Sequence, residues 1–136
     1  MLRSFIHRAR QILFWDQARP LELFSGLNLL SWAYLLWAQP ELVTRDSYAG
    51  FQALGAGIWA FVLLVIAVVQ LAPVFWSFAR GHDLRFVAMA LASGAWLMIA
   101  SNFITSGVST TADTNYLLLS FTCMASGVWL AWISRD

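Results

Sequence analysis

The chain has 136 residues, of which 60% are hydrophobic and only 11% are charged. Globular domains carry about 25% charged residues, so this composition excludes an ordinary water-soluble domain and indicates a membrane protein with several spans. The net charge is +1, which excludes the broad basic surface that nucleic-acid binding requires.

Residues 2–15 precede the first long apolar run and place apolar side chains at helical spacing. Arg3, His7 and Arg10 lie on the opposite face, which predicts an amphipathic helix in the membrane interface. We expect Arg3, Arg8 and Arg10 to bind lipid headgroups of the anionic inner leaflet. A topology anchor and a functional sensor both fit this pattern.

Four apolar runs predict four transmembrane helices, at about residues 21–38, 54–78, 86–104 and 116–133. The second run has no charged side chain and, at a rise of ~1.5 Å per residue, is long enough to cross a hydrocarbon core of about 30 Å. The short connections require neighbouring spans to be antiparallel. The predicted fold class is an all-α membrane protein, with four transmembrane helices in one antiparallel bundle.

The segments between the spans carry most of the charges. Residues 80–85, RGHDLR, are expected to form a hairpin loop, and residues 105–115 a loop rich in Ser and Thr. Glu22 lies in the first turn of the first span, near the positive end of the helix dipole. We expect Glu22 to cap and anchor this helix at the interface rather than to bind an ion.

The arginines are distributed unevenly over the two sides of the predicted bundle. One side receives Arg45 alone, and the other receives Arg3, Arg8, Arg10, Arg19, Arg80, Arg85 and Arg135. The positive-inside rule therefore predicts a multi-pass protein of the bacterial inner membrane, with both termini in the cytoplasm.

Residues with catalytic or ligand-binding chemistry are scarce. The two histidines, His7 and His82, lie outside the predicted spans, and Cys123 is the single cysteine. Haem and metal sites need convergent ligands, and ion-coupled transporters keep a buried charge on their path. We therefore expect no catalytic residue, no bound metal and no cofactor, and we interpret the protein as a non-enzyme.

The polar side chains inside the predicted spans are neutral and few. We expect each to form a hydrogen bond with a neighbouring helix, in preference to forming a substrate site. This set comprises Asn28, Gln70, Asn102 and Thr122.

A short internal similarity supplies candidates for close helix packing. Residues 92–97 and 125–130 share the pattern A-S-G-x-W-L. Small residues let two helix backbones approach, and aromatic residues fill the space beside them. An inverted repeat of the transporter type is the alternative interpretation. The packing candidates are Trp32, Ser93, Gly94, Trp96, Ser126 and Gly127.

The stretch FWDQARPLELFSGLNLLSWAYLL at residues 14–36, the long apolar second span and the polar loop before the last span resemble small four-span proteins encoded by phages and prophages. Members of that group are described as hypothetical or holin-like membrane proteins. The resemblance implies a viral protein in a host membrane. It includes no catalytic signature, so no functional residue is carried over from it.

Three hypotheses for the function remain. The first, narrowly favoured, is a phage-type protein that self-associates and permeabilises the host inner membrane, as holins do. The second is an interaction protein, either an accessory subunit of a membrane complex or a protein that excludes superinfection. The third is a small-solute carrier, a dimer with Gln70, Pro73 and Asn102 near its path.

Overall fold

The structure is a computed structural model and describes residues 18–75, 81–107 and 110–133. Every described element is helical, which confirms the predicted all-α class. The predicted interfacial helix at residues 2–15, with Arg3, Arg8 and Arg10, lies outside the described residues. The elements are α2 (Arg19–Ala38), η1 (Pro40–Thr44), η2 (Asp46–Phe51), α3 (Ala56–Phe75), α4 (Gly81–Thr105) and α5 (Thr111–Ile133), where η marks a 3-10 helix.

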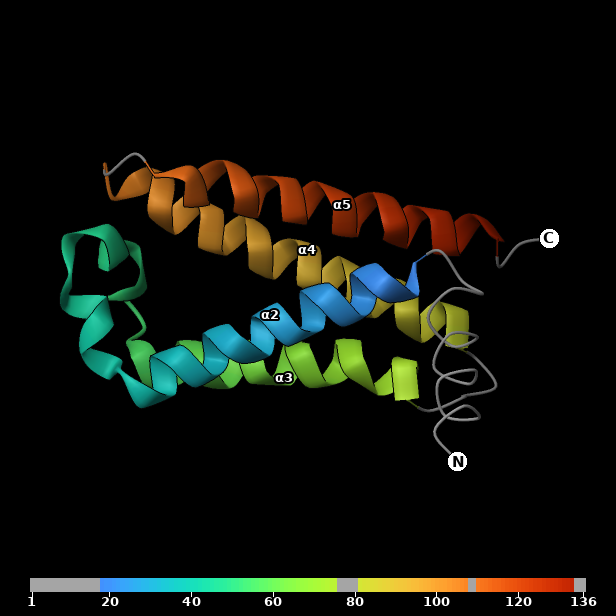
Figure 1. Cartoon of the computed structure of the whole chain (residues 1–136), viewed down its shortest axis with the longest axis horizontal. Coiled ribbons are helices and arrows are strands. Elements are labelled where there is room, and N and C mark those ends of the chain that lie inside the picture. Colours follow the sequence, from blue (N-terminus) through green and yellow to red (C-terminus); the bar gives the residue numbers. More distant parts are fainter. Residues whose placement is uncertain (1–17, 76–80, 108–109, 134–136) are drawn as a thin grey trace, which may run out of the picture.

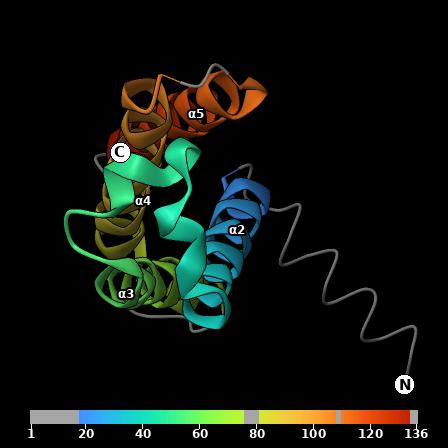
Figure 2. The same cartoon turned by 90° about the vertical axis from the view of Figure 1, so that its left-hand side faces the viewer.

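The four long helices form two hairpins. Helix α2 packs along α3 and α4 packs along α5, while contacts between α3 and α4 join the two hairpins (Figure 1). Helix α2 begins and α5 ends at the same end of the bundle. The two 3-10 helices, which we call the cap, cover the opposite end (Figures 1 and 2). Sequential neighbours are thus antiparallel.

Two helical segments, Ala56–Phe75 and Asp83–Thr105, are long and apolar enough to cross a membrane, judged by length and composition over the described residues. Helices α2 and α5 have 20 and 23 residues, but α2 carries Arg19 and Glu22 and α5 opens with a polar turn. By this criterion the structure supports two of the four predicted spans.

Two helices begin earlier than predicted. Helix α4 begins at Gly81, so the prediction of a hairpin loop at residues 80–85 is wrong for residues 81–85, which are helical. Helix α5 begins at Thr111, because Thr110 and Asp113 bond to each other and cap the helix N-terminus. The Thr110 backbone N–H donates to Asp113 Oδ2 (3.3 Å), and its hydroxyl donates to Oδ1 (3.0 Å).

An aromatic cluster fills the capped end of the bundle. Trp32 of α2 stacks on Phe51 of η2, with 5.8 Å between ring centroids, and meets Tyr116 of α5 edge-on at 5.6 Å. Tyr48 of η2 meets Phe103 of α4 at 5.3 Å. Aromatic pairs of this kind stabilise a structure beyond the area that they bury. The cap is therefore part of the hydrophobic core.

Two glycines lie in tight contacts between helices. A Cβ at Gly26 of α2 would lie 2.7 Å from the Leu71 side chain of α3, and a Cβ at Gly127 of α5 would lie 3.3 Å from Cβ of Met89 in α4. A Cβ at Gly94 of α4 would meet no neighbouring atom of the described chain within 4 Å. Gly127 thus lies in a contact between helices, as predicted. Gly94 lies on an exposed face of α4, so the helix contact predicted there is absent among the described residues.

Candidate functional site

A buried polar cluster joins all four long helices around the hydroxyl group of Ser25. Ser25 of α2 accepts hydrogen bonds from Trp96 Nε1 of α4 (2.8 Å) and from the Cys123 thiol of α5 (3.5 Å). Its own hydroxyl donates to Gln70 Oε1 of α3 (3.2 Å), and Gln70 Nε2 contacts Met89 Sδ of α4 (3.3 Å). The five side chains are buried. Hydrogen bonding in this cluster offsets the cost of placing polar groups in the core.

An ion pair lies nearer the uncapped end of the bundle. Arg85 Nε donates to Glu22 Oε1 at 2.7 Å, and the two side chains are 5% and 2% exposed. The expectation that Glu22 is an interfacial anchor is therefore wrong within this structure. Glu22 instead faces the bundle interior, because α2 turns the same stripe inward that carries Ser25 and Leu29. The pair joins the first hairpin to the second.

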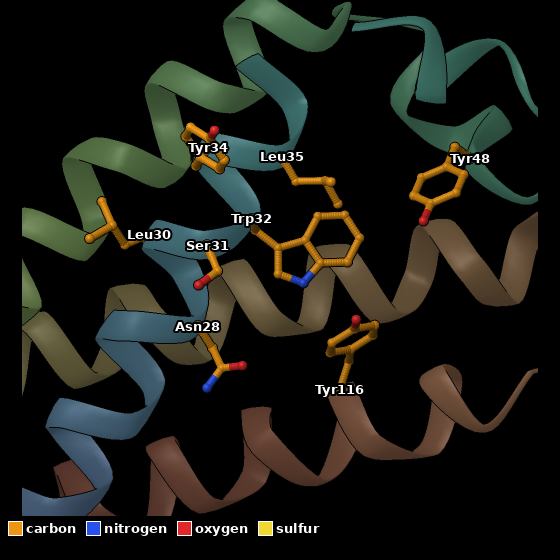
Figure 3. Close-up of a pocket in the computed structure, with 8 residues that line it drawn as sticks. All are labelled: Asn28, Leu30, Ser31, Trp32, Tyr34, Leu35, Tyr48 and Tyr116. Carbon is orange, nitrogen blue, oxygen red and sulfur yellow. The ribbon is translucent and has the colours of Figure 1, made fainter. Parts of the chain in front are cut away.

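A cleft opens between α2 and α5. The two helices meet at Ser25 and Cys123 and diverge from there toward the cap (Figures 1 and 2). We call this cleft the wedge. Figure 3 shows Asn28 and Trp32 reaching from α2 toward α5, and Tyr116 reaching back from α5. The wedge has a volume of about 780 Å³ and is lined by Asn28, Leu30, Ser31, Trp32, Tyr34, Leu35, Tyr48 and Tyr116 (Figure 3).

The polar groups on the α2 wall of the wedge donate to their own helix. Asn28 Nδ2 donates to the carbonyl oxygen of Phe24 (2.8 Å), and the Ser31 hydroxyl donates to that of Leu27 (2.9 Å). Each of these bonds occupies one side-chain donor within α2 itself. The expected bond from Asn28 to a neighbouring helix is therefore not made through this donor.

The other predicted polar residues are scattered over the bundle. Thr122 donates to the carbonyl oxygen of Leu118 (2.9 Å), within its own helix. Asn102 lies against Gly50 of the cap, where a Cβ would be 2.9 Å from the Asn102 Cα. Gln70 and Asn102 do not converge, because Gln70 contacts Met89, which lies 13 residues from Asn102 on α4, or about 20 Å. They therefore do not share one binding site.

The two copies of the A-S-G-x-W-L pattern have different surroundings. In α4, Ser93 and Trp96 are buried, and Trp32 of α2 is buried likewise. In α5, Ser126 is half-buried and Trp129 is 53% exposed. The copies therefore face the bundle differently and do not form a structural repeat.

Ser93 forms hydrogen bonds with Ser120, a residue that lies outside both copies of the A-S-G-x-W-L pattern. Each hydroxyl donates to the other residue's backbone carbonyl oxygen at 2.9 Å, and the two hydroxyl oxygens lie 3.2 Å apart. Both serines are buried. This reciprocal bonding fixes α4 against α5.

Sequence reasoning missed the central role of Ser25 and the burial of Glu22. Both lie on the stripe of α2 that also includes Leu29, Trp32 and Leu36, at spacings of three and four residues. That spacing marks one helix face. The periodicity of residues 21–38 was therefore the signal that identifies these buried polar residues.

No group of three or more His, Cys, Asp or Glu side chains that could hold a metal ion occurs within the described ranges. Comparison with protein-family models, with curated proteins and with solved structures found no match to this chain. The functional argument therefore depends on the buried clusters, the wedge and the outer surface.

Proposed function

We propose that this protein is a non-enzymatic, four-span protein of the bacterial inner membrane that acts by binding another membrane component. An accessory subunit and a superinfection-exclusion protein are two biological forms of this one activity. The supporting observation is the contrast between the interior and the surface of the bundle. Polar groups in the interior bond to one another, while the exterior is apolar and aromatic.

Exposed aromatic side chains support the placement in a bilayer. Tyr34 and Trp37 are 72% and 77% exposed near the capped end, while Phe75 and Trp132 are 72% and 71% exposed near the other end. Aromatic residues gather at the two interfaces of membrane proteins. With the arginine distribution of the sequence, this arrangement supports a cytoplasmic position for the uncapped end and both termini.

The disposition of polar groups favours binding over pore formation. A water-filled pore needs polar groups that face the channel. Here Ser25, Gln70, Ser93 and Ser120 are bonded inside a single copy of the chain, so they are not available to line a channel between copies. A surface-recognition role therefore fits this bundle better than permeabilisation.

Self-association of the holin type is the second candidate, and one observation favours it. Ala90 and Gly94 are exposed one turn apart on the outer face of α4, and space beside Gly94 is open. Such small-xxx-small faces allow two membrane helices to approach closely. A second copy that packs on this face would support the holin hypothesis.

Induction of the protein in a bacterial host separates the two candidates. We expect the membrane potential and growth to stay steady, and the protein to co-purify with one membrane component in fixed proportion. Sudden, timed depolarisation that releases a co-expressed endolysin would overturn the binding role. In that case the Gly94→Leu variant, whose side chain has room in the single copy, should fold normally and delay depolarisation.

A further inference from the structure

We propose that the wedge between α2 and α5 holds one acyl chain of a phospholipid from the leaflet at the capped end. This inference depends on the proposed placement in a bilayer. It goes beyond that proposal, because it assigns a lipid site to a specific set of residues. These are the eight residues that line the wedge (Figure 3).

The depth of the wedge decides which occupant fits. The wedge is closed where the Cys123 thiol lies 3.5 Å from the Ser25 hydroxyl, and its last lining residue on α2 is Leu35. Ten residues of helix separate Ser25 from Leu35, a rise of about 15 Å, which is half of a hydrocarbon core of about 30 Å. The wedge is therefore one leaflet deep.

A transmembrane helix does not fit a cleft of this depth. Such a helix continues for about 20 residues across both leaflets, and it would collide with the contact between α2 and α5. The same obstacle excludes a span from a second copy of the chain. A lipid chain ends at the middle of the bilayer, where the wedge also ends.

The wall chemistry suits a hydrocarbon chain. Leu30, Leu35 and the rings of Trp32 and Tyr34 supply apolar surface, while the Ser31 hydroxyl and one N–H of the Asn28 amide donate to their own helix. A chain that fills the wedge therefore leaves those donors bonded.

The open end of the wedge suits the polar part of a lipid. Tyr48 belongs to the cap, so its phenol stands at the open end of the wedge, whereas Tyr116 lies deeper, with its ring stacked on Trp96 at 5.5 Å between centroids (Figure 3). Phenol hydroxyls donate hydrogen bonds to ester or phosphate oxygens. The site thus combines an apolar wall with the Tyr48 hydroxyl group at its open end.

Photo-crosslinking in nanodiscs of phosphatidylethanolamine and phosphatidylglycerol tests the proposal, using phospholipids with a diazirine in the middle of one acyl chain. We expect crosslinks to concentrate on Ser31, Leu35 and Tyr116, relative to Val65 and Leu97, which are 44% and 46% exposed on other faces. An even distribution over all these residues would mean ordinary annular lipid and would overturn the site. Crosslinks in the wedge to a protein would also overturn it.

Two matched variants provide a second measurement. Ser31 and Ser101 are both exposed helix serines whose hydroxyls donate to the carbonyl four residues earlier, but only Ser31 lines the wedge. Native mass spectrometry should find one retained phospholipid on the wild type and on Ser101→Trp, and none on Ser31→Trp. Retention on Ser31→Trp would overturn the proposal. The wild-type crosslinking map decides the question even where Ser31→Trp fails to fold.

The outcomes for the lipid site and for the membrane role are distinct. A protein that is extracted from membranes by alkaline carbonate would contradict the proposed placement in the bilayer. A protein that stays in the membrane but shows uniform crosslinks contradicts the lipid site alone.

Discussion

The indole Nε1–H of Trp96 donates a 2.8 Å hydrogen bond to the hydroxyl of Ser25, and this bond joins α4 to α2 in the centre of the bundle. Both side chains are fully buried, although they are 71 residues apart in the sequence. Ser25 also bonds to Gln70 of α3 and Cys123 of α5, so one hydroxyl group links all four long helices. The cluster therefore fixes the two hairpins relative to each other.

Ser25→Ala should destabilise the protein by about 1–3 kcal/mol, because it leaves the buried Trp96 N–H without its acceptor. The measurement is thermal unfolding in a mild detergent, followed by circular dichroism. Ser31→Ala is the control, since this exposed serine bonds only to its own helix, and we expect a change within about 0.5 kcal/mol. Equal effects of the two substitutions would contradict the central role of Ser25.

Glu22→Met should cost about 3–5 kcal/mol, because it removes the carboxylate to which the buried Arg85 guanidinium donates. The double variant Glu22→Met with Arg85→Met should recover most of this loss, since two apolar side chains of similar size replace the ion pair. Denaturation by a harsh detergent measures both. Glu41→Met, at an exposed position of η1, is the control and should change stability little. A double variant no more stable than Glu22→Met would refute the coupling.

Gly127→Leu and Gly94→Leu should differ clearly in their effect on the stability of the protein. The larger side chain at Gly127 must displace Met89, whose Cβ lies 3.3 Å from the position of the new Cβ, and we expect a loss of about 1–3 kcal/mol. Gly94 has open space around it, so Leu there should leave the stability of the single copy unchanged. Thermal unfolding at low protein concentration checks both variants. If Gly94→Leu lowered stability and Gly127→Leu did not, the tight contact described at Gly127 would be contradicted.

The long helices were predictable from the sequence, whereas several helix ends were not. Apolar runs mark the helix interiors, because bilayer and core both select hydrophobic side chains. Helix α5 starts earlier than its apolar run because Thr110 and Asp113 form a polar cap, and α4 extends through a charged segment to Gly81. Hydropathy does not detect such polar first turns.

The buried polar residues were predictable only in part. The spacing of Glu22 and Ser25 on the inner face of α2 is visible in the sequence, but their partners are not. Arg85 lies 63 residues from Glu22, and Trp96 lies 71 residues from Ser25. These pairings depend on how the two hairpins dock. The wedge also depends on this docking, since it is formed by the angle between α2 and α5.

Cysteine labelling should report opposite sides of the membrane for Ser47 and Asp83. Ser47 lies in the cap and Asp83 lies exposed in the first turn of α4, at the other end of the bundle. In a background where the buried Cys123 is changed to Ala, a membrane-impermeant maleimide should modify Ser47→Cys in intact spheroplasts and Asp83→Cys only after lysis. The reverse pattern would invert the proposed orientation, and labelling of both from outside would exclude the four-span arrangement.

Gly50→Ala should loosen the cap and destabilise the protein by about 1–3 kcal/mol through overpacking. A Cβ at Gly50 would lie 2.9 Å from the Cα of Asn102, and that backbone atom is fixed within α4. Gly57→Ala is the matched control, because a Cβ at Gly57 in α3 meets no described atom within 4 Å. Alanine favours a helix over glycine there, so this control should stabilise by about 0.4–1 kcal/mol. Near-ultraviolet circular dichroism, which reports the aromatic cluster under the cap, should weaken for Gly50→Ala only. Equal melting temperatures and equal aromatic signals in the two variants would mean that η2 does not pack on α4.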